Sequence, residues 1–380
     1  MTPPYTLQQL ILYFLKLGTI GFGGPVALVG YMHRDLVEKR KWIDEESYKE
    51  GLALAQLAPG PLAAQLAIYI GYIDYKYLGA TLVGLAFVLP SFLIVVLLSI
   101  AYVNFGGLPW MQSIFYGVGA SVIGIIAVSS YKLTKKTIGR ESILWIIFII
   151  LAAFTAITET ENIWLILAGG IGYLFYKSPK LLQKIFLSFL FLPILLQITD
   201  MFDSNNKLWK IGLFFLKAGS LIFGSGLAIV PFLYGGVVKE YHWLNEQQFL
   251  DAVAVAMITP GPVVITVAFI GYLVVGFPGA CVAAVATFLP CYLFTIIPAP
   301  YFKKYGKKPA IKHFVDGITA AAIGAIAGAV IVLAKRQFHD VITVLIAIAT
   351  AIILLRFKKI PEPVIILIAA VIGLIVKFTT

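Results

Sequence analysis

Residues 14–29 of the chain read FLKLGTIGFGGPVALV, and residues 215–230 read FLKAGSLIFGSGLAIV. The second stretch lies 201 residues after the first and aligns with it without a gap. A Pro-Gly-Pro motif at 59–61 recurs at the same offset, at 260–262. An internal repeat is the first feature to establish, because one unit used twice decides the architecture of a whole chain. The sequence therefore predicts two copies of one structural unit.

The repeat continues beyond these motifs, at an offset that becomes 200 after a one-residue gap. The matched pairs that follow are Gly79 with Gly279, Pro90 with Pro290 and Gly124 with Gly324. Near the ends, Gly172 matches Gly373, at an offset of 201. We predict an N-terminal repeat at 1–176, a linker at 177–210 and a C-terminal repeat at 211–380. The linker holds an apolar run without a counterpart, Ile185–Ile198, which is expected to cross the membrane once.

The composition places the chain in a lipid bilayer. Apolar residues make up 60% of the 380 residues and charged residues 12%, whereas soluble domains have about 25% charged residues. Apolar runs long enough to cross a membrane recur from end to end, and the mean hydropathy is +0.95. Such runs form helices, since a lone strand cannot satisfy its backbone in lipid. We predict an all-α polytopic membrane protein, which excludes a soluble enzyme and a nucleic-acid-binding domain.

The charge pattern predicts that the two repeats have opposite orientations. The net charge of +11 arises in loops, where lysine and arginine mark the cytoplasmic side of a membrane protein. The strongly basic loops are 132–140 in the first repeat and 303–312 and 356–359 in the second. Of their counterparts, 335–340 has two basic residues against one acid, 104–109 has no charge and 159–162 has only acids. Inverted repeats are common in secondary transporters, whose substrate site lies near the bilayer midplane between the repeats.

Each repeat is predicted to open with helices of about half the membrane-crossing length. These segments are 6–21, 25–38, 46–58 and 61–73, and then 208–223, 226–239, 246–259 and 262–275. Full spans are expected at 78–103, 110–131, 142–158, 162–176, 185–199, 277–299, 312–334, 341–356 and 363–378. Broken segments at matching places in two repeats are the best sequence indication of a transport site.

The breaks themselves favour an anion, because a helix N-terminus carries partial positive charge and unpaired N–H groups. A plain proline kink is the alternative. Glutamine and threonine shortly after Pro-Gly-Pro could donate to an oxyanion, or could serve a helix contact. The candidate substrate-binding residues from these motifs are Gly23, Gly24, Gly224, Ser225, Gly60, Gly261, Gln65 and Thr266.

Two matched lysines are the charged candidates for the site. Lys16 and Lys217 lie inside apolar helices just before the glycine breaks. A lysine at the centre of a membrane helix costs about 2.5–3.5 kcal/mol on insertion scales, so it usually has a partner or a task. If the repeats pack about a pseudo-two-fold axis, both lysines can bind one dianion. Alternatively, they extend to the lipid headgroups.

Two matched acids, Glu50 and Asp251, each precede Pro-Gly-Pro by nine positions. They could carry a coupling proton, or they could be solvated residues at the membrane surface. The four histidines are scattered and the two cysteines lie in apolar segments, so we expect no metal site and no cofactor.

These motifs resemble the chromate ion transporter family in its long, two-repeat form. The resemblance rests on FLKLGTIGFGGPVA, LAQLAPGPLAAQLAIYIGY, FGSGLAIVPF, WLNEQQFLDAVAVAMITPGPVVITVAFIGY and FLPCYLF, and it covers about residues 10–375. The chain departs at Leu28, where many members have histidine, and at Met257, where the first repeat has Gln56. The resemblance implies a transporter in the prokaryotic plasma membrane that typically exports chromate, with sulfate as a similar oxyanion.

Two other functional classes stay open. A passive anion channel could use the same lysines. A membrane-embedded enzyme for lipids would need an Asp-rich metal motif or a His/Glu/Asp cluster, and the sequence has neither; we therefore expect no enzymatic activity. Glycine and alanine patterns such as 117–120 and 320–328 permit a homo-oligomer, although packing within one chain also explains them.

Overall fold

A computed structural model describes most of the chain. The described residues are 4–21, 24–105, 109–159, 163–178, 206–220, 222, 229–305, 309–338, 340–357, 360 and 362–379. Within them all regular structure is helical. Four helical stretches are long and apolar enough to cross a membrane: Leu62–Phe105, Trp110–Lys132, Val263–Phe302 and Pro309–Lys335. The prediction of an all-α, multi-pass membrane protein is confirmed.

The helices follow the same order in both repeats. The first repeat contains α1 (Leu7–Ile20), α2 (Gly24–Met32), the π-helix η1 (His33–Lys39), α3 (Glu45–Leu57), α4 (Leu62–Phe105), α5 (Pro109–Thr137), α6 (Ser142–Thr158) and α7 (Ile163–Lys177). The second contains α10 (Lys207–Ser220), α11 (Val230–Leu233), the π-helix η4 (Tyr234–Glu240), α12 (Glu246–Ile258), the short 3₁₀ helix η5 (Val263–Ile265), α13 (Thr266–Ile296), α14 (Ala299–Tyr305), α15 (Pro309–Gln337), α16 (Val341–Arg356) and α17 (Glu362–Thr379). The predicted helix at 185–199 lies outside the described residues.

The repeats match even where the backbone is irregular. The two π-helices, η1 and η4, lie 201 residues apart, and π-helices are rare. Lys41 and His242, also 201 residues apart, have positive φ values of 53° and 50°. Shared irregularities of this kind show that both repeats have the same local backbone structure.

The helices α4 and α13 each fold back on themselves. The bend lies at Lys76 in α4, where φ is 50°, and at Gly276 in α13, where φ is 72°. A methyl group on Gly71 would lie 2.4 Å from the carbonyl oxygen of Gly79, although eight residues of straight α-helix span about 12 Å. Each helix is therefore a short arm packed against a long arm, and the predicted break between 61–73 and 78–103 is confirmed.

The two repeats exchange their last helices. The pair α6 and α7 of the first repeat packs on α15 of the second, while α16 and α17 pack on α5. Glycines allow the close approach: a methyl group on Gly324 would lie 2.4 Å from the carbonyl oxygen of Phe148, and one on Gly124 would lie 2.5 Å from that of Ala347. The small-residue patterns thus serve packing within the chain.

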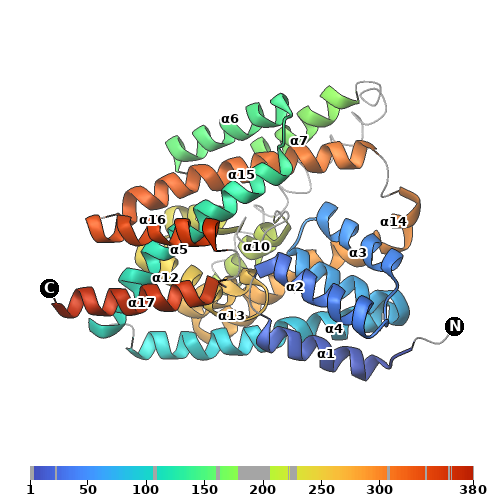
Figure 1. Cartoon of the computed structure of the whole chain (residues 1–380), viewed down its shortest axis with the longest axis horizontal. Coiled ribbons are helices and arrows are strands. Elements are labelled where there is room, and N and C mark those ends of the chain that lie inside the picture. The colour runs from blue at the N-terminus through green and yellow to red at the C-terminus, as the bar shows by residue number, and fades with distance from the viewer. Residues whose placement is uncertain are drawn as a thin grey trace.

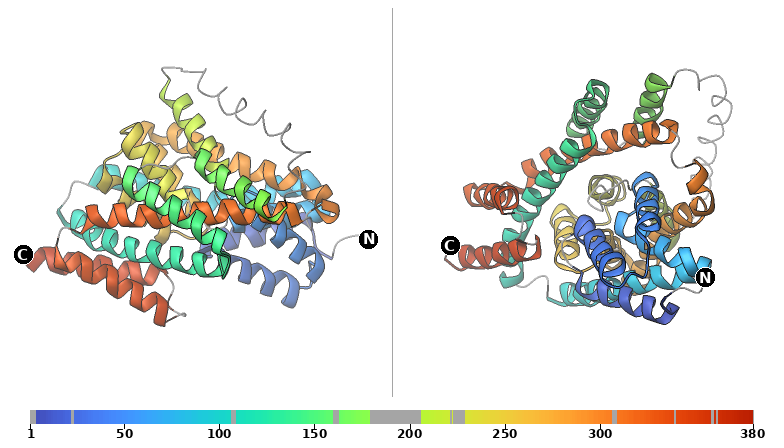
Figure 2. Two further views of the ribbon diagram at one scale, coloured as in Figure 1. Left: turned by 90° about the horizontal axis from the view of Figure 1, so that it is seen from above. Right: turned by 45° about the vertical axis from the view of Figure 1, so that its right-hand side comes forward.

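The opening segments form a second body beside these exchanged helices. Helix α1 packs on α4, α10 packs on α13, and α4 packs on α13. Figure 2 (right) shows α5 and α15 as a layer next to this body, with α6, α7, α16 and α17 along the outer side of the layer. The chain ends lie at opposite sides of the molecule (Figure 1). The candidate residues from both repeats therefore lie mostly in one body.

Candidate functional site

The breaks of the two repeats meet through a reciprocal pair of hydrogen bonds. The N–H of Gly60 donates to the carbonyl oxygen of Ile222 at 2.6 Å, and the N–H of Gly261 donates to that of Gly21 at 3.0 Å. Both donors and both acceptors are repeat-matched pairs, so each Pro-Gly-Pro turn binds the chain break of the other repeat. We call this region, residues 21, 59–61, 222 and 260–262, the central crossing.

Glycine is required in both turns of the central crossing. Gly60 has a φ of 144° and Gly261 a φ of 91°, in the region that residues with side chains rarely adopt. A methyl group on Gly261 would lie 2.0 Å from the Oγ of Ser91, and one on Gly60 would lie 2.7 Å from the Nε2 of Gln65. Ser91 comes from α4, so the turn of the second repeat fits closely against a helix of the first.

The hydrogen bonds of the central crossing change the expectation for its N–H groups. From the sequence, the N–H groups of Gly60 and Gly261 were expected to be free for an anion. In this structure both donate to protein carbonyl oxygens. A bound oxyanion would have to replace these hydrogen bonds, or use other N–H groups at the same helix starts.

Gln65 and Thr266 lie directly behind the two turns and are buried. The Nε2 of Gln65 donates to the carbonyl oxygen of Pro59 at 2.8 Å, and the hydroxyl of Thr266 donates to that of Val263 at 2.8 Å. The Oε1 of Gln65 is buried and receives no hydrogen bond from any described residue. In this conformation both donors therefore form hydrogen bonds within their own repeat, at or next to the turn.

Gly24 begins α2, next to the break that follows α1. Gly23, Gly224 and Ser225 lie outside the described residues.

The two candidate lysines lie on matched helices and differ in exposure. Lys16 is exposed on α1, whose buried residues, among them Phe14 and Gly18, face away from it. Lys217 is half-buried on α10. Helix α1 packs on α4 and α10 packs on α13. A shared dianion between them stays a prediction.

The two candidate acids have different surroundings. Asp251 is 3% exposed, and its carboxylate accepts hydrogen bonds from the hydroxyl of Tyr102 at 2.7 Å and the Nε2 of Gln247 at 2.8 Å. Glu50 is half-buried, beside the phenol of Tyr69. Of the two alternatives from the sequence, the solvated surface position is therefore wrong for Asp251, because α12 is buried along most of its length.

The sequence analysis missed Tyr102 and Gln247. Their repeat-matched counterparts are Phe302 and Glu46. Both positions differ in polarity or charge between the repeats. A search of the aligned repeats for such differences would have found them, because they indicate where the two repeats differ in function.

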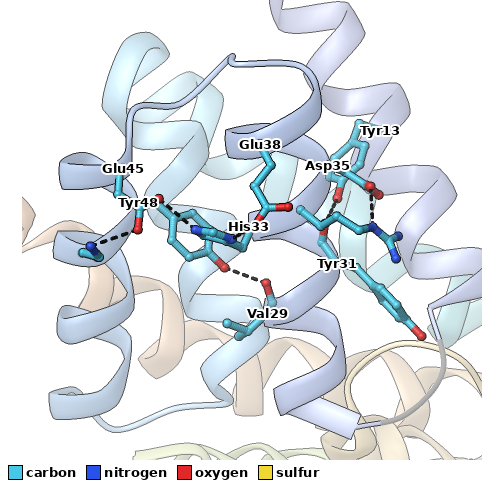
Figure 3. A network of polar contacts seen from close by, with 10 residues as sticks. Tyr13, Val29, Tyr31, His33, Asp35, Glu38, Glu45 and Tyr48 are labelled. Atoms are coloured by element: carbon cyan, nitrogen blue, oxygen red, sulfur yellow. Dashed lines mark hydrogen bonds and ion pairs between the residues drawn. The ribbon is translucent and has the colours of Figure 1, made fainter. Parts of the chain in front are cut away.

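A polar network also ties the π-helix of each repeat to the next half-helix. In the first repeat, the Nε2 of His33 lies 2.9 Å from the carboxylate of Glu45 and its Nδ1 lies 3.2 Å from that of Glu38 (Figure 3). In the second, the hydroxyl of Tyr234 donates to Glu246 at 3.2 Å. Tyr234 matches His33, and Glu246 matches Glu45. His33, to which the sequence analysis gave no role, therefore makes the same contact between π-helix and half-helix in the first repeat that Tyr234 makes in the second.

The comparisons with known proteins agree with the two-repeat organisation. The family model described as chromate transporter matches residues 8–174 and again 209–374. No solved structure matches the chain. The family model thus matches once in each predicted repeat.

The relatives that match cover most of the chain. A chromate transport protein of Cupriavidus metallidurans is 68% identical over 91% of this chain and 87% of its own length. A probable chromate transport protein of Synechococcus elongatus is 63% identical over 90% of this chain and 88% of its own length. An uncharacterized transporter of Methanocaldococcus jannaschii is 30% identical over 83% of this chain. The protein is a multi-pass membrane protein of the plasma membrane, and it belongs to the chromate transporter family.

Proposed function

We propose that the protein is a secondary transporter that exports chromate across the plasma membrane by alternating access. The central crossing carries this proposal, because its reciprocal hydrogen bonds join the broken helices of both repeats at their interface. Substrate sites of repeat-built transporters lie at such interfaces, next to helix starts that favour anions. The names of the relatives that are 68% and 63% identical support chromate as the substrate.

In this proposal the repeats have opposite orientations in the membrane and rock against each other. The motion exchanges the hydrogen bonds of Gly60 and Gly261 for contacts with the oxyanion, together with the N–H groups of the glycine breaks. Lys16 and Lys217 supply the positive charge that a dianion needs. Sulfate, which has the same tetrahedral shape and charge, competes with chromate.

Counterflow in proteoliposomes tests the transporter. Vesicles with the purified protein are loaded with unlabelled chromate and receive labelled chromate outside. A carrier accumulates label transiently above equilibrium, and excess sulfate reduces this accumulation; a channel only equilibrates the label. Absence of label uptake above that of empty liposomes would show that chromate is the wrong substrate.

The lysines and the direction are tested separately. K16A and K217A are each expected to reduce counterflow at least tenfold, while K135A, at an exposed position of α5, leaves it unchanged. If both lysine variants transport normally, the site depends on the backbone turns alone. Expression of the wild-type protein in cells should raise the tolerated chromate concentration, and lowered tolerance would indicate import.

A further inference from the structure

Asp251 is a buried acid that accepts hydrogen bonds from two neutral donors and pairs with no described lysine or arginine. It lies on α12, which packs against α4, α5, α13, α17, η4 and η5. Helix α13 and η5 contain no charged residue. The described charged side chains on α12 and the other elements are Asp74, Lys76, Lys132, Lys135, Lys239, Glu240, Glu246 and Glu362. In the described part of the chain, none of these is bonded to Asp251: its partners are Tyr102 and Gln247.

An ionised carboxylate in this position is unfavourable in free energy. Burial of an ionised group without a counter-charge costs several kcal/mol even in a relaxed protein, whereas a neutral carboxyl with hydrogen-bond partners is tolerated. The proton that neutralises Asp251 must come from water and must return to water when the residue becomes accessible. Burial of this residue is therefore linked to proton uptake.

The hydrogen bond from Tyr102 links this acid to the other repeat. Tyr102 lies near the end of α4 in the first repeat, and its ring packs edge-on against Phe115 of α5 and Phe269 of α13, at 5.4 and 5.2 Å between ring centres. The phenol thus joins a helix of one repeat to a half-helix of the other. A movement between the repeats that separates α4 from α12 would break this hydrogen bond.

The matched acid lacks these properties. Glu50 is half-buried, and its helix α3 has the exposed Glu46 at the position that Gln247 occupies in α12. Tyr69, the phenol beside Glu50, belongs to the same repeat, and the counterpart of Tyr102 is Phe302. The position that Tyr102 occupies in the first repeat thus holds a side chain without a hydroxyl in the second.

We propose that Asp251 is the proton-carrying residue of the transport cycle, that Tyr102 positions it, and that Glu50 has no such role. The carboxyl takes one proton from water on one side of the membrane, is buried as the neutral acid while it binds Tyr102, and releases the proton on the other side. The inference rests on the proposed transport function and deepens it by naming the coupling ion and its carrier.

Two assays with the same vesicles separate coupling from transport. Counterflow needs no driving force, whereas accumulation of chromate under an imposed pH gradient needs proton coupling. D251N, which keeps the shape of a neutral acid, is expected to retain counterflow within about twofold and to lose gradient-driven accumulation. E50Q should retain both. Y102F should retain counterflow and lower gradient-driven accumulation about tenfold, a split that a purely structural role would not produce.

Gradient-driven accumulation by D251N at the wild-type level would overturn the inference, and so would its loss in E50Q but not in D251N. Absence of wild-type counterflow would instead refute chromate as substrate. In that case the infrared spectrum of the purified protein still tests the proton site. The C=O stretch of a protonated carboxylic acid should be present in the wild-type protein and in E50Q, and it should be reduced in D251N. An unchanged spectrum in D251N would contradict a proton on this residue.

Discussion

Glu50 and Asp251 occupy equivalent positions of the two repeats, and the turns that follow them are alike, yet their side chains have different surroundings. Asp251 is buried and accepts hydrogen bonds from two neutral donors, one of them from the other repeat. Glu50 is half-buried, on a helix with an exposed second carboxylate at Glu46.

This comparison distinguishes backbone features that both repeats share from side chains that differ between them. Both Pro-Gly-Pro turns form the same hydrogen bond with the other repeat, and each does so through a glycine with a positive φ. The side chains around the acids carry no such geometric constraint. We therefore expect symmetric effects from changes in the turns and asymmetric effects from changes around the acids.

The largest effect is expected in the turns. G60A and G261A should each destabilise the protein by about 3 kcal/mol or more, because the positive φ is strained by a side chain and the added methyl group overlaps a neighbour. The measurement is thermal unfolding of the detergent-purified protein. G139A is the matched control, since Gly139 has a φ of 53° but open space around it, and it should lose only about 1–2 kcal/mol. A tolerated change at only one of the two turns would break their equivalence.

An exchange around the acids should have unequal effects. Q247E removes a donor from buried Asp251 and adds a second carboxylate, and we expect a loss of about 1–3 kcal/mol of stability at pH 7.5. The reverse change, E46Q, alters an exposed residue and should stay within about 0.5 kcal/mol. Thermal unfolding of both variants measures the difference. Equal shifts would mean that the two acids are equivalent after all.

The starts of α16 and α6 sharpen the comparison at a smaller scale. Asp340 caps α16: its Oδ1 accepts the N–H of Thr343 at 2.8 Å, and the hydroxyl of Tyr116 donates to Oδ2. Glu141 precedes α6 without a side-chain cap and pairs with Lys177 at 3.0 Å. Loss of a cap costs about 1 kcal/mol. D340A should therefore reduce stability at pH 7 by about that amount, and E141A by less.

The effect of D340A also depends on pH. The hydrogen bond from Tyr116, and then that from the Thr343 backbone, lower the pKa of Asp340 from its ordinary value of 3.8. Asp340 lies between α15 and α16. Because the pKa is lower in the folded protein, the stabilisation is complete above pH 3.8 and is lost as the pH falls through the folded value. Unfolding of wild type and D340A should converge in acid, and a difference that grows on acidification would contradict this.

The smallest effect is expected at His33, whose counterpart in the second repeat is Tyr234. H33Y and Y234H exchange the residues that tie each π-helix to the next half-helix, by His33 to Glu45 and by Tyr234 to Glu246. The His33–Glu45 pair is exposed, and exposed polar pairs contribute little, so H33Y should change the melting temperature by less than about 2 °C. Tyr234 is only 3% exposed, so Y234H should lower the melting temperature by more than that. H33A is the comparison that removes the contact, and H33Y should be at least as stable as H33A.

The sequence was sufficient to predict where single membrane helices begin and end. The bounds predicted for 142–158 and 341–356 agree with α6 and α16, because apolar runs flanked by polar residues have one low-energy structure in lipid. The breaks at Pro-Gly-Pro and near Lys76 were also predicted. Proline and glycine act on the backbone within a few residues, so their effect can be inferred locally.

The candidate site was only partly predictable. The motifs identified the turns, but their N–H groups have partners 162 to 240 residues away, Ile222 for Gly60 and Gly21 for Gly261. No local pattern reports such a partner. The same holds for Tyr102, which is 149 residues from Asp251.

The sequence by itself determined the membrane class, the two repeats, the places where their helices break and the family. These follow from composition, periodicity and motifs, which act over short stretches of chain. Only the tertiary structure decided that the last two helices of each repeat pack on the other repeat. It also decided that the turns form hydrogen bonds between the repeats, and that one matched acid is buried. These depend on which surfaces approach each other, and glycines such as Gly124 and Gly324 permit that approach without specifying the partner.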